Sequence, residues 1–420
     1  MTFESFAEAQ STFLWATFAI AMIMGAVVNK TNFCTMGAVS DWVNMGDLGR
    51  IRAWILAIAI ALLGVVVLES LGLVAPGGAF PPYRAGNLIW AENLLGGVLF
   101  GIGMTLASGC GNKTLVRIGG GNIKSIMVLL VIGVIAYFMV NPFPGTDQTL
   151  FTVLFYDWIR PLAVDLGKAQ DLGTLASKDN PVGARLVIGA ILGLAALVYV
   201  FKSADFRGSF DNILGGLIVG LAVVAAWYVS TAVKIDLDGE MYSLSSYAQQ
   251  WDFLADSSAG KPAEIRSLNP QSFTFINPMG QTMGYVAGKF NSATLTFGIM
   301  ALFGVIAGSF LWSLVSRRFR IEWFASFKDF ATHFIGAVLM GFGGVLGLGC
   351  TIGQGITGVS TLALGSFITL ISIVFGSALT MKIQYYKMVY EDDASFGKAL
   401  ITSLVDMKLL PGGMRKLEAV

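Results

Sequence analysis

The sequence predicts an all-α integral membrane protein with about nine transmembrane helices, together with broken or re-entrant ones. Hydrophobic residues make up 55% of the 420 residues and charged residues only 13%, whereas soluble domains carry about 25% charged residues. Glycine supplies 51 residues, which suits membrane helices whose backbones approach one another closely. Long apolar runs along the chain are the third indication of this fold class.

A transmembrane helix needs about 20 apolar residues. Runs near this length lie at 12–29, 51–73, 94–108, 124–141, 185–201, 211–232, 293–315, 334–348 and 366–386. The further run 150–164 contains charges and a proline, so we expect it to be short or interfacial. The short runs 94–108 and 334–348 each end in glycine-rich sequence at a cysteine. They predict helices that break inside the membrane, which is tolerated where protein or a water-filled cavity surrounds the bare backbone.

The distribution of lysine and arginine predicts the orientation, because these residues concentrate in cytoplasmic loops. Three short connections carry them and are therefore placed in the cytoplasm: Arg50 with Arg52, Lys202 with Arg207, and Arg317 with Arg318 and Arg320. The polar, acidic segment 233–291 then forms an external loop, which we expect to carry no residue essential for function. The start of the chain lacks the positive region of a cleaved signal peptide, so we expect the first apolar run to be retained.

Composition excludes several classes of function. The net charge of +1 implies no basic surface for nucleic acid. A single histidine, His333, cannot supply a multi-histidine zinc, haem or di-iron site. The three cysteines form no C-x-x-C pair, and their odd number and wide spacing do not indicate a disulfide framework. We therefore expect no metal, no cofactor and no enzymatic activity.

An internal repeat is the strongest signal of organisation. Residues 95–110 and 335–350 align without gaps, with eight of sixteen positions identical and a cysteine last in both copies. The loop charges place the start of one copy near the outside and the start of the other near the inside. Inverted repeats of this kind build transporters with a site at the membrane midplane. We predict one membrane transport domain over 1–420, with repeat halves at about 12–141 and about 293–386.

The three cysteines, Cys34, Cys110 and Cys350, each end an apolar run and open a glycine-flanked polar stretch. Glycine permits unwound backbone, and half-helix N-termini offer N–H donors to an anion. A buried cysteine can also be a small packing residue, and for one cysteine that interpretation would be preferred. Three cysteines at three such breaks, two of them at equivalent repeat positions, favour a functional role.

The chemistry of the thiol indicates the kind of anion. A thiol is a weak donor and a soft, polarisable partner, so it suits a terminal sulfur better than sulfate or phosphate. Four nearby polar residues could contact the oxygen end of such an anion: Asn112, Lys113, Thr351 and Gln354. For Lys113, anchoring at the membrane interface is an equally good interpretation.

The motifs resemble those of the YeeE/YedE family of inner-membrane sulfur transporters. The matching stretches are N-F-C-T-M-G-A at 32–38, G-M-T-L-A-S-G-C-G at 103–111, R-I-G-G-G at 117–121 and G-C-T-I-G-Q-G at 349–355. They cover both repeat halves but not 141–184 or 233–291. The resemblance implies a multi-pass protein of the bacterial inner membrane that imports thiosulfate. It further implies a pore narrowed by membrane-dipping loops and lined by Cys34, Cys110 and Cys350, and a separate cytosolic TusA-like sulfur carrier as a partner.

Three alternatives to a thiosulfate permease stay open at this point. A selenium-compound transporter of the same family would use the same pore. A membrane sulfurtransferase or redox protein would use the cysteines covalently, but activation of a thiolate needs adjacent cations or a helix N-terminus, and only Lys113 lies close in sequence. A purely structural membrane subunit predicts that removing the thiols changes nothing beyond stability.

Overall fold

The computed structural model describes residues 1–255 and 260–418, so residues 256–259 of the polar segment 233–291 lie outside the described residues. Within the described part, nine helical segments are long and apolar enough to cross a membrane, which confirms the predicted number. Two of them, Phe6–Met45 and Trp90–Gly119, are interrupted by a break. The run 150–164 forms only short helical turns, as predicted.

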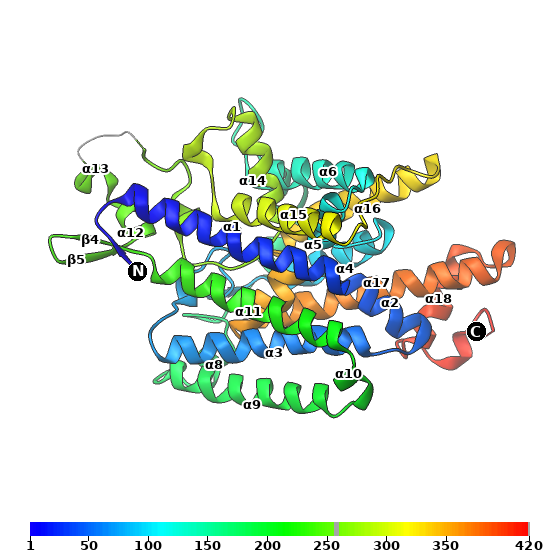
Figure 1. The fold of residues 1–420 in the computed structure, drawn as a ribbon. Helices are drawn as coiled ribbons and strands as arrows, with labels where there is room; N and C mark the ends of the chain where they lie inside the picture. Colours follow the sequence, from blue (N-terminus) through cyan, green and yellow to red (C-terminus); the bar gives the residue numbers. More distant parts are fainter. Residues whose placement is uncertain (256–259, 419–420) are drawn as a thin grey trace.

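The long helices pack into a bundle, together with several shorter helices (Figure 1). Their bounds are α1 Phe6–Thr31, α2 Thr35–Met45, α3 Gly49–Ser70, α4 Trp90–Leu106, α5 Gly111–Gly119, α6 Ile123–Val140, α9 Pro181–Phe201, α11 Phe210–Ala232, α14 Ile276–Ala287, α15 Phe297–Val315, α16 Phe327–Leu346 and α17 Leu364–Val389. Shorter helices are α7 Asp157–Ile159, α8 Leu172–Ala176, α10 Ala204–Gly208, α12 Leu244–Gln249, α13 Trp251–Leu254 and α18 Phe396–Asp406.

Short strands cap one end of the bundle and connect its outer loops. The strands are β1 Thr2–Phe3, β2 Asn87–Leu88, β3 Val164–Asp165, β4 Lys234–Leu237 and β5 Glu240–Ser243. They form a three-stranded sheet in the order β1-β4-β5, with β1 parallel and β5 antiparallel to β4, and a separate antiparallel pair β2-β3. The sheet ties the start of the chain to the segment that follows α11.

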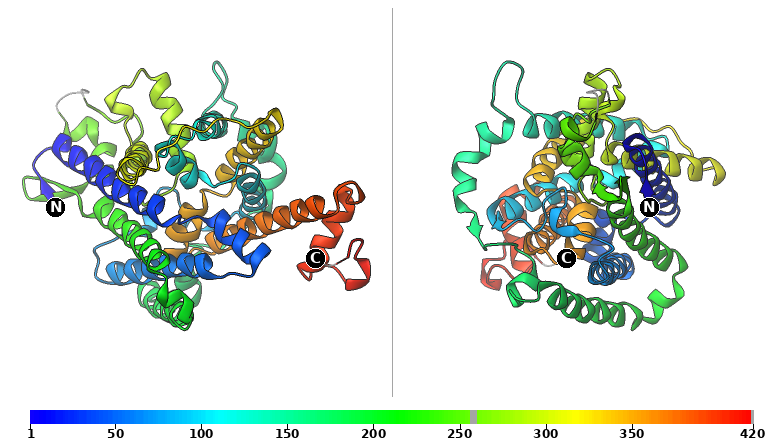
Figure 2. Two further views of the ribbon diagram at one scale, coloured as in Figure 1. Left: turned by 45° about the vertical axis from the view of Figure 1, so that its right-hand side comes forward. Right: turned by 90° about the vertical axis from the view of Figure 1, so that its left-hand side faces the viewer.

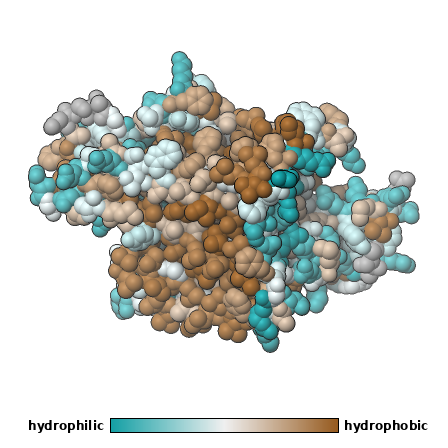
Figure 3. Space-filling model, in the orientation of Figure 1, coloured by the Kyte–Doolittle hydropathy of each residue, from teal (hydrophilic) through white to brown (hydrophobic). Residues whose placement is uncertain are grey.

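The three arginine- and lysine-rich connections all lie at one end of the bundle, on the right in Figure 1. The helices α3 and α11 begin there, whereas α9 and α15 end there, so the chain alternates in direction from one span to the next (Figure 1). We call this the basic end. Apolar side chains gather over the middle of the face shown in Figure 3, and hydrophilic ones gather at its right-hand end.

Helix α9 shows how the outer surface of the bundle is built. It lies on the outside of the bundle in Figures 1 and 2 and packs against α3. Val187, Ile191, Leu194 and Val198 are each more than half exposed, and their spacing places them on one face of the helix. An exposed apolar helix face of this kind is what a lipid-facing helix presents.

The centre of the bundle is a close crossing of α4 and α16. Gly96 faces Gly343, and Gly103 faces Gly336; a Cβ atom at any of these four positions would come within 2.7 Å of a backbone atom of the other helix. Because the contacts pair early residues of one helix with late residues of the other, α4 and α16 run in opposite directions. Small residues allow membrane helices to pack backbone to backbone in this way.

We expect Gly343→Ala to destabilise the protein, because the added Cβ would lie 2.5 Å from the backbone nitrogen of Phe100. Overpacking of this kind costs about 1–3 kcal/mol. The midpoint of thermal unfolding of the purified protein in detergent should therefore fall. The matched control is Gly397→Ala in α18, where an added Cβ meets nothing within 4 Å. An unchanged midpoint for Gly343→Ala would contradict the backbone contact.

Candidate functional site

The first break separates α1 from α2. Helix α1 ends at Thr31, and Asn32 adopts a left-handed conformation with φ of 52°. The chain then turns so that Cys34 becomes the N-cap of α2. The Cys34 sulfur accepts a hydrogen bond from the backbone nitrogen of Gly37 at 3.5 Å. The thiol therefore sits at the positive end of the α2 dipole.

The second break separates α4 from α5 in the same manner. Ser108 has a φ of 58°, and Cys110 is the N-cap of α5. Gly111 follows directly, and a Cβ there would lie 3.0 Å from Ile276 Cδ1. The glycine beside this cysteine is therefore explained by the close approach of the start of α14.

The third break follows α16. Leu348 has a φ of 57°, and Gly349 has a φ of 157°. The Cys350 sulfur accepts a hydrogen bond from the backbone nitrogen of Gly353 at 3.4 Å, at the start of the π-helical turn Gly353–Gly358. All three cysteines thus stand where one helical segment has ended and the next begins. This is the break geometry predicted from the sequence for the runs 94–108 and 334–348.

The three thiols lie deep in the molecule and close to one another. Cys34, Cys110 and Cys350 are 6%, 2% and 0% exposed, respectively, and none is in a disulfide. Cys110 lies within electrostatic range of both other cysteines, and Thr351 lies beside its sulfur. The breaks therefore bring residues far apart in the sequence into one buried neighbourhood.

The other predicted site residues lie in the same neighbourhood. Asn112 is 2% exposed and Gln354 is 1% exposed. Gln354 Nε2 donates to the carbonyl oxygen of Gly347 at 2.6 Å, which ties the third break together. Lys113 Nζ donates to Asn32 Oδ1 at 3.3 Å and lies within electrostatic range of Cys34 and Cys110. Lys113 therefore joins the first two breaks.

Sequence reasoning missed Thr35 and Thr274. Thr35 follows Cys34 directly. Thr274 belongs to the polar segment 233–291, yet a Cβ added at Gly353 would lie 2.4 Å from its hydroxyl oxygen. The segment 271–276 is buried throughout, so this segment contributes to the candidate site, where the sequence analysis expected no essential residue. The alternation of polar residues with Phe273 and Phe275 before N-P-M-G was the available signal.

Several buried polar atoms around the cysteines have no hydrogen-bond partner in the described part of the chain. They include Thr35 Oγ1, Asn112 Oδ1, Thr274 Oγ1, Thr351 Oγ1 and Gln354 Oε1. A buried polar atom left unpaired costs about 1–3 kcal/mol. The threonine hydroxyls among them can donate a hydrogen bond to a bound anion, whereas the two amide oxygens can only accept one.

Cavities approach the breaks from both ends. A cavity of about 120 Å³ is lined by Phe80, Pro81, Pro82, Val140, Asn277, Gly344, Val345, Leu348 and Gly349, next to Cys350. It shares three lining residues with a cavity of about 210 Å³ under the outer loops. Nearer the basic end, a narrow pocket is lined by Cys34 and Arg50. There Arg50 forms a bidentate ion pair with Asp41.

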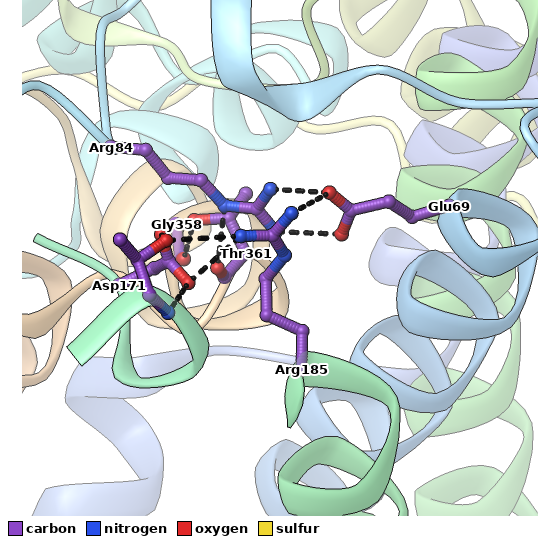
Figure 4. Close-up of polar contacts among 7 residues, drawn as sticks. Glu69, Arg84, Asp171, Arg185, Gly358 and Thr361 are labelled. Carbon is purple, nitrogen blue, oxygen red and sulfur yellow. Dashed lines mark hydrogen bonds and ion pairs between the residues drawn. The ribbon is translucent and has the colours of Figure 1, made fainter. Parts of the chain in front are cut away.

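A buried ion-pair network anchors the far end of the third break (Figure 4). Arg84 donates to both carboxylate oxygens of Glu69 at 2.6 and 2.9 Å and to the carbonyl oxygen of Thr361 at 2.8 Å. Arg185 contacts Glu69 at 3.0 Å and Asp171 at 3.2 Å. The network balances two positive and two negative charges, so it can stay buried.

This arrangement has the chemistry of an anion site with a soft end. Helix N-termini offer N–H groups and a positive dipole, the thiols are polarisable, and the unpartnered atoms include hydroxyl groups that can donate. The described residues hold no group of three or more metal-ligating side chains of the His, Cys, Asp or Glu type. Together, the thiols and the hydroxyl groups could contact a small anion that has both a soft end and an oxygen end.

Comparison with known proteins agrees with this chemistry. The thiosulfate transporter TsuA of Escherichia coli (strain K12) is 24% identical over 368 residues, which cover 84% of this chain and 90% of that protein. The thiosulfate transporter TsuA of Spirochaeta thermophila is 22% identical over 375 residues, which cover 87% of this chain and 97% of that protein. The family described as sulphur transport matches residues 30–379 and so includes all three cysteines. The resemblance inferred from the cysteine motifs is confirmed, and this chain belongs to the sulphur transport family.

Proposed function

We propose that this chain is a permease that imports thiosulfate, or a similar small sulfur anion, across the bacterial inner membrane. The observation that carries the proposal is the gathering of three buried thiols at the starts of helical segments, beside threonine hydroxyls that have no hydrogen-bond partner in the described part of the chain. The names of the relatives support thiosulfate as the anion. In this proposal Cys34, Cys110 and Cys350 line the path.

Thiosulfate has two chemically different ends, and the site offers a partner for each. The terminal sulfur is soft and suits the thiols. The oxygen end needs hydrogen-bond donors, which Asn112, Lys113, Thr351 and Gln354 can supply together with Thr274. Removing one hydrogen-bond partner costs far more free energy for a dianion that has lost its hydration water than for a neutral group. Each contact is therefore expected to matter for transport more than for stability.

The helix arrangement supports the proposal that the path lies between inverted repeats. In the aligned repeat copies, Gly96 corresponds to Gly336 and Gly103 corresponds to Gly343. If the two copies exchanged places, the contact between Gly96 and Gly343 would become the contact between Gly336 and Gly103, and both contacts are present. In the same exchange, the packing of α1 on α15 corresponds to that of α3 on α11, and that of α4 on α17 to that of α16 on α6. The proposed second half would then start at α11 instead of near residue 293.

The charges favour a channel-like route. An inside-negative potential opposes the import of a dianion by about 4.6 kcal/mol per 100 mV, so uptake needs consumption inside or a coupled cation. Coupling to protons would need a buried acid that is free to bind and release a proton. In the described part of the spans, the buried acids Asp41, Glu69 and Glu92 each pair with an arginine.

We expect Cys→Ala at position 34, 110 or 350 to reduce uptake of labelled thiosulfate at least 10-fold while leaving membrane expression near that of the wild type. The truncation removes only a sulfur atom, a small change beside the 2–5 kcal/mol of a Leu→Ala core substitution. Cys→Ser separates two mechanisms, because a hydroxyl can still donate but cannot accept a sulfur atom covalently as a thiol does. Partial uptake by the serine variants supports non-covalent passage. Wild-type uptake by all three alanine variants would return the cysteines to a packing role.

We expect Thr274→Val to reduce uptake while leaving stability unchanged or slightly raised. Its hydroxyl oxygen has no partner, so replacing it with a methyl group removes a desolvation cost without breaking a bond. The matched control is Thr282→Val in α14, whose hydroxyl donates to the carbonyl oxygen of Pro278 at 2.8 Å. The control should keep uptake and lose a little stability. Full uptake by Thr274→Val, measured alongside thermal unfolding, would remove Thr274 from the proposed path.

A further inference from the structure

The connection between α3 and α4 carries a buried tyrosine that the cysteine motifs do not include. Tyr83 is 2% exposed, and its hydroxyl oxygen is inaccessible and has no hydrogen-bond partner in the described part of the chain. A tyrosine hydroxyl usually finds a partner when it is buried. Tyr83 therefore presents a donor with no protein acceptor.

Tyr83 lies at the third break. Cys350 is within electrostatic range of its hydroxyl. The three residues before it, Phe80, Pro81 and Pro82, line the cavity of about 120 Å³ that reaches Gly349. The residues just before Tyr83 therefore line the same cavity as the residues just before Cys350.

The same segment is held in place by the residue that follows. Arg84 is 4% exposed and is fixed by Glu69 on one side and by the carbonyl oxygen of Thr361 on the other (Figure 4). Thr361 belongs to the stretch that ends the third break. The ion-pair network thereby couples the position of Tyr83 to the chain that contains Cys350.

The protonation state suits a donor role. Burial raises the pKa of Tyr83 above its ordinary value, so the phenol keeps its proton at physiological pH. It brings a hydrogen-bond donor without a negative charge that would repel an anion. A lysine or arginine at this position would bind an anion more strongly and could hold it, whereas conduction needs binding weak enough for release.

We infer that Tyr83 is a further specificity-determining residue, whose hydroxyl donates a hydrogen bond to the oxygen end of a sulfur oxyanion at Cys350. Arg84 acts as its positioning residue. The inference rests on the proposed transport function and adds a contact on the outer side of the third cysteine. It gives the unpartnered hydroxyl an acceptor and explains why a buried ion-pair network lies beside the break.

The test is labelled-thiosulfate uptake by the purified full-length chain in liposomes, comparing wild type with Tyr83→Phe. A hydrogen bond to a charged group contributes enough that its loss raises KM about 10-fold or more. The melting midpoint should not fall, because the lost hydroxyl has no protein partner. Tyr228→Phe, at a partly exposed position on α11, is the matched control and should keep the wild-type KM.

Failure of this inference and failure of the proposed function give different results. Wild-type liposomes without uptake would contradict the proposed function. Wild-type uptake with an unchanged KM for Tyr83→Phe, or a lower melting midpoint with an unchanged KM, would overturn the role of Tyr83 alone. Arg84→Lys keeps the charge but loses the bidentate geometry. Introduced into the wild type, Arg84→Lys should raise KM, and introduced into Tyr83→Phe it should raise KM little further. If the two substitutions raised KM additively, positioning of Tyr83 by Arg84 would be contradicted.

Discussion

Three breaks between helical segments leave polar groups unpaired in the interior of the bundle, and the rest of the structure is arranged around this constraint. Bare backbone at this depth is tolerated only where protein or a water-filled cavity surrounds it. The Cys34 and Cys350 sulfurs each accept a hydrogen bond from a backbone N–H group of the helical segment that follows. Threonine hydroxyls without a hydrogen-bond partner in the described part of the chain lie beside the thiols, and these hydroxyls can donate to a small anion.

Two kinds of contact hold the breaks in place. Glycines such as Gly96 and Gly343 allow α4 and α16 to meet backbone to backbone, so the second and third breaks extend from a single rigid crossing. Buried ion pairs then fix the chain on the far side, as Arg84 does for the stretch ending the third break. Rigid elements on both sides of a break keep binding groups in position more precisely than a free loop would.

The sequence predicted the spans and the cysteine breaks because both leave local signals. Nine apolar runs matched nine spans, and the glycines around Cys110 and Cys350 marked the interruptions. Thr274 and Tyr83 were not predicted, because neither lies in an apolar run or a cysteine motif. Their burial depends on tertiary packing, since each is brought to Cys350 from a connection distant in sequence. Asn112 and Gln354 were predicted from proximity to a cysteine, and the structure buries both.

The ion pairs were beyond the reach of sequence reasoning for a related reason. Glu69 lies near the end of α3, where the sequence alone favours a solvated position, yet its side chain is 9% exposed and contacts Arg84 and Arg185. Charges in membrane proteins are commonly paired in the interior, but no local pattern identifies partners 15 and 116 residues apart in the chain.

The central claim is that the buried thiols contact the soft end of the transported anion. Selenosulfate replaces the terminal sulfur of thiosulfate with selenium and keeps the oxygen end. A crystal structure of this chain with selenosulfate, measured at the selenium absorption edge, would locate that atom directly. We predict an anomalous peak in van der Waals contact with the sulfur of Cys34, Cys110 or Cys350. Selenosulfate bound elsewhere, with its selenium away from all three sulfurs, would contradict the account.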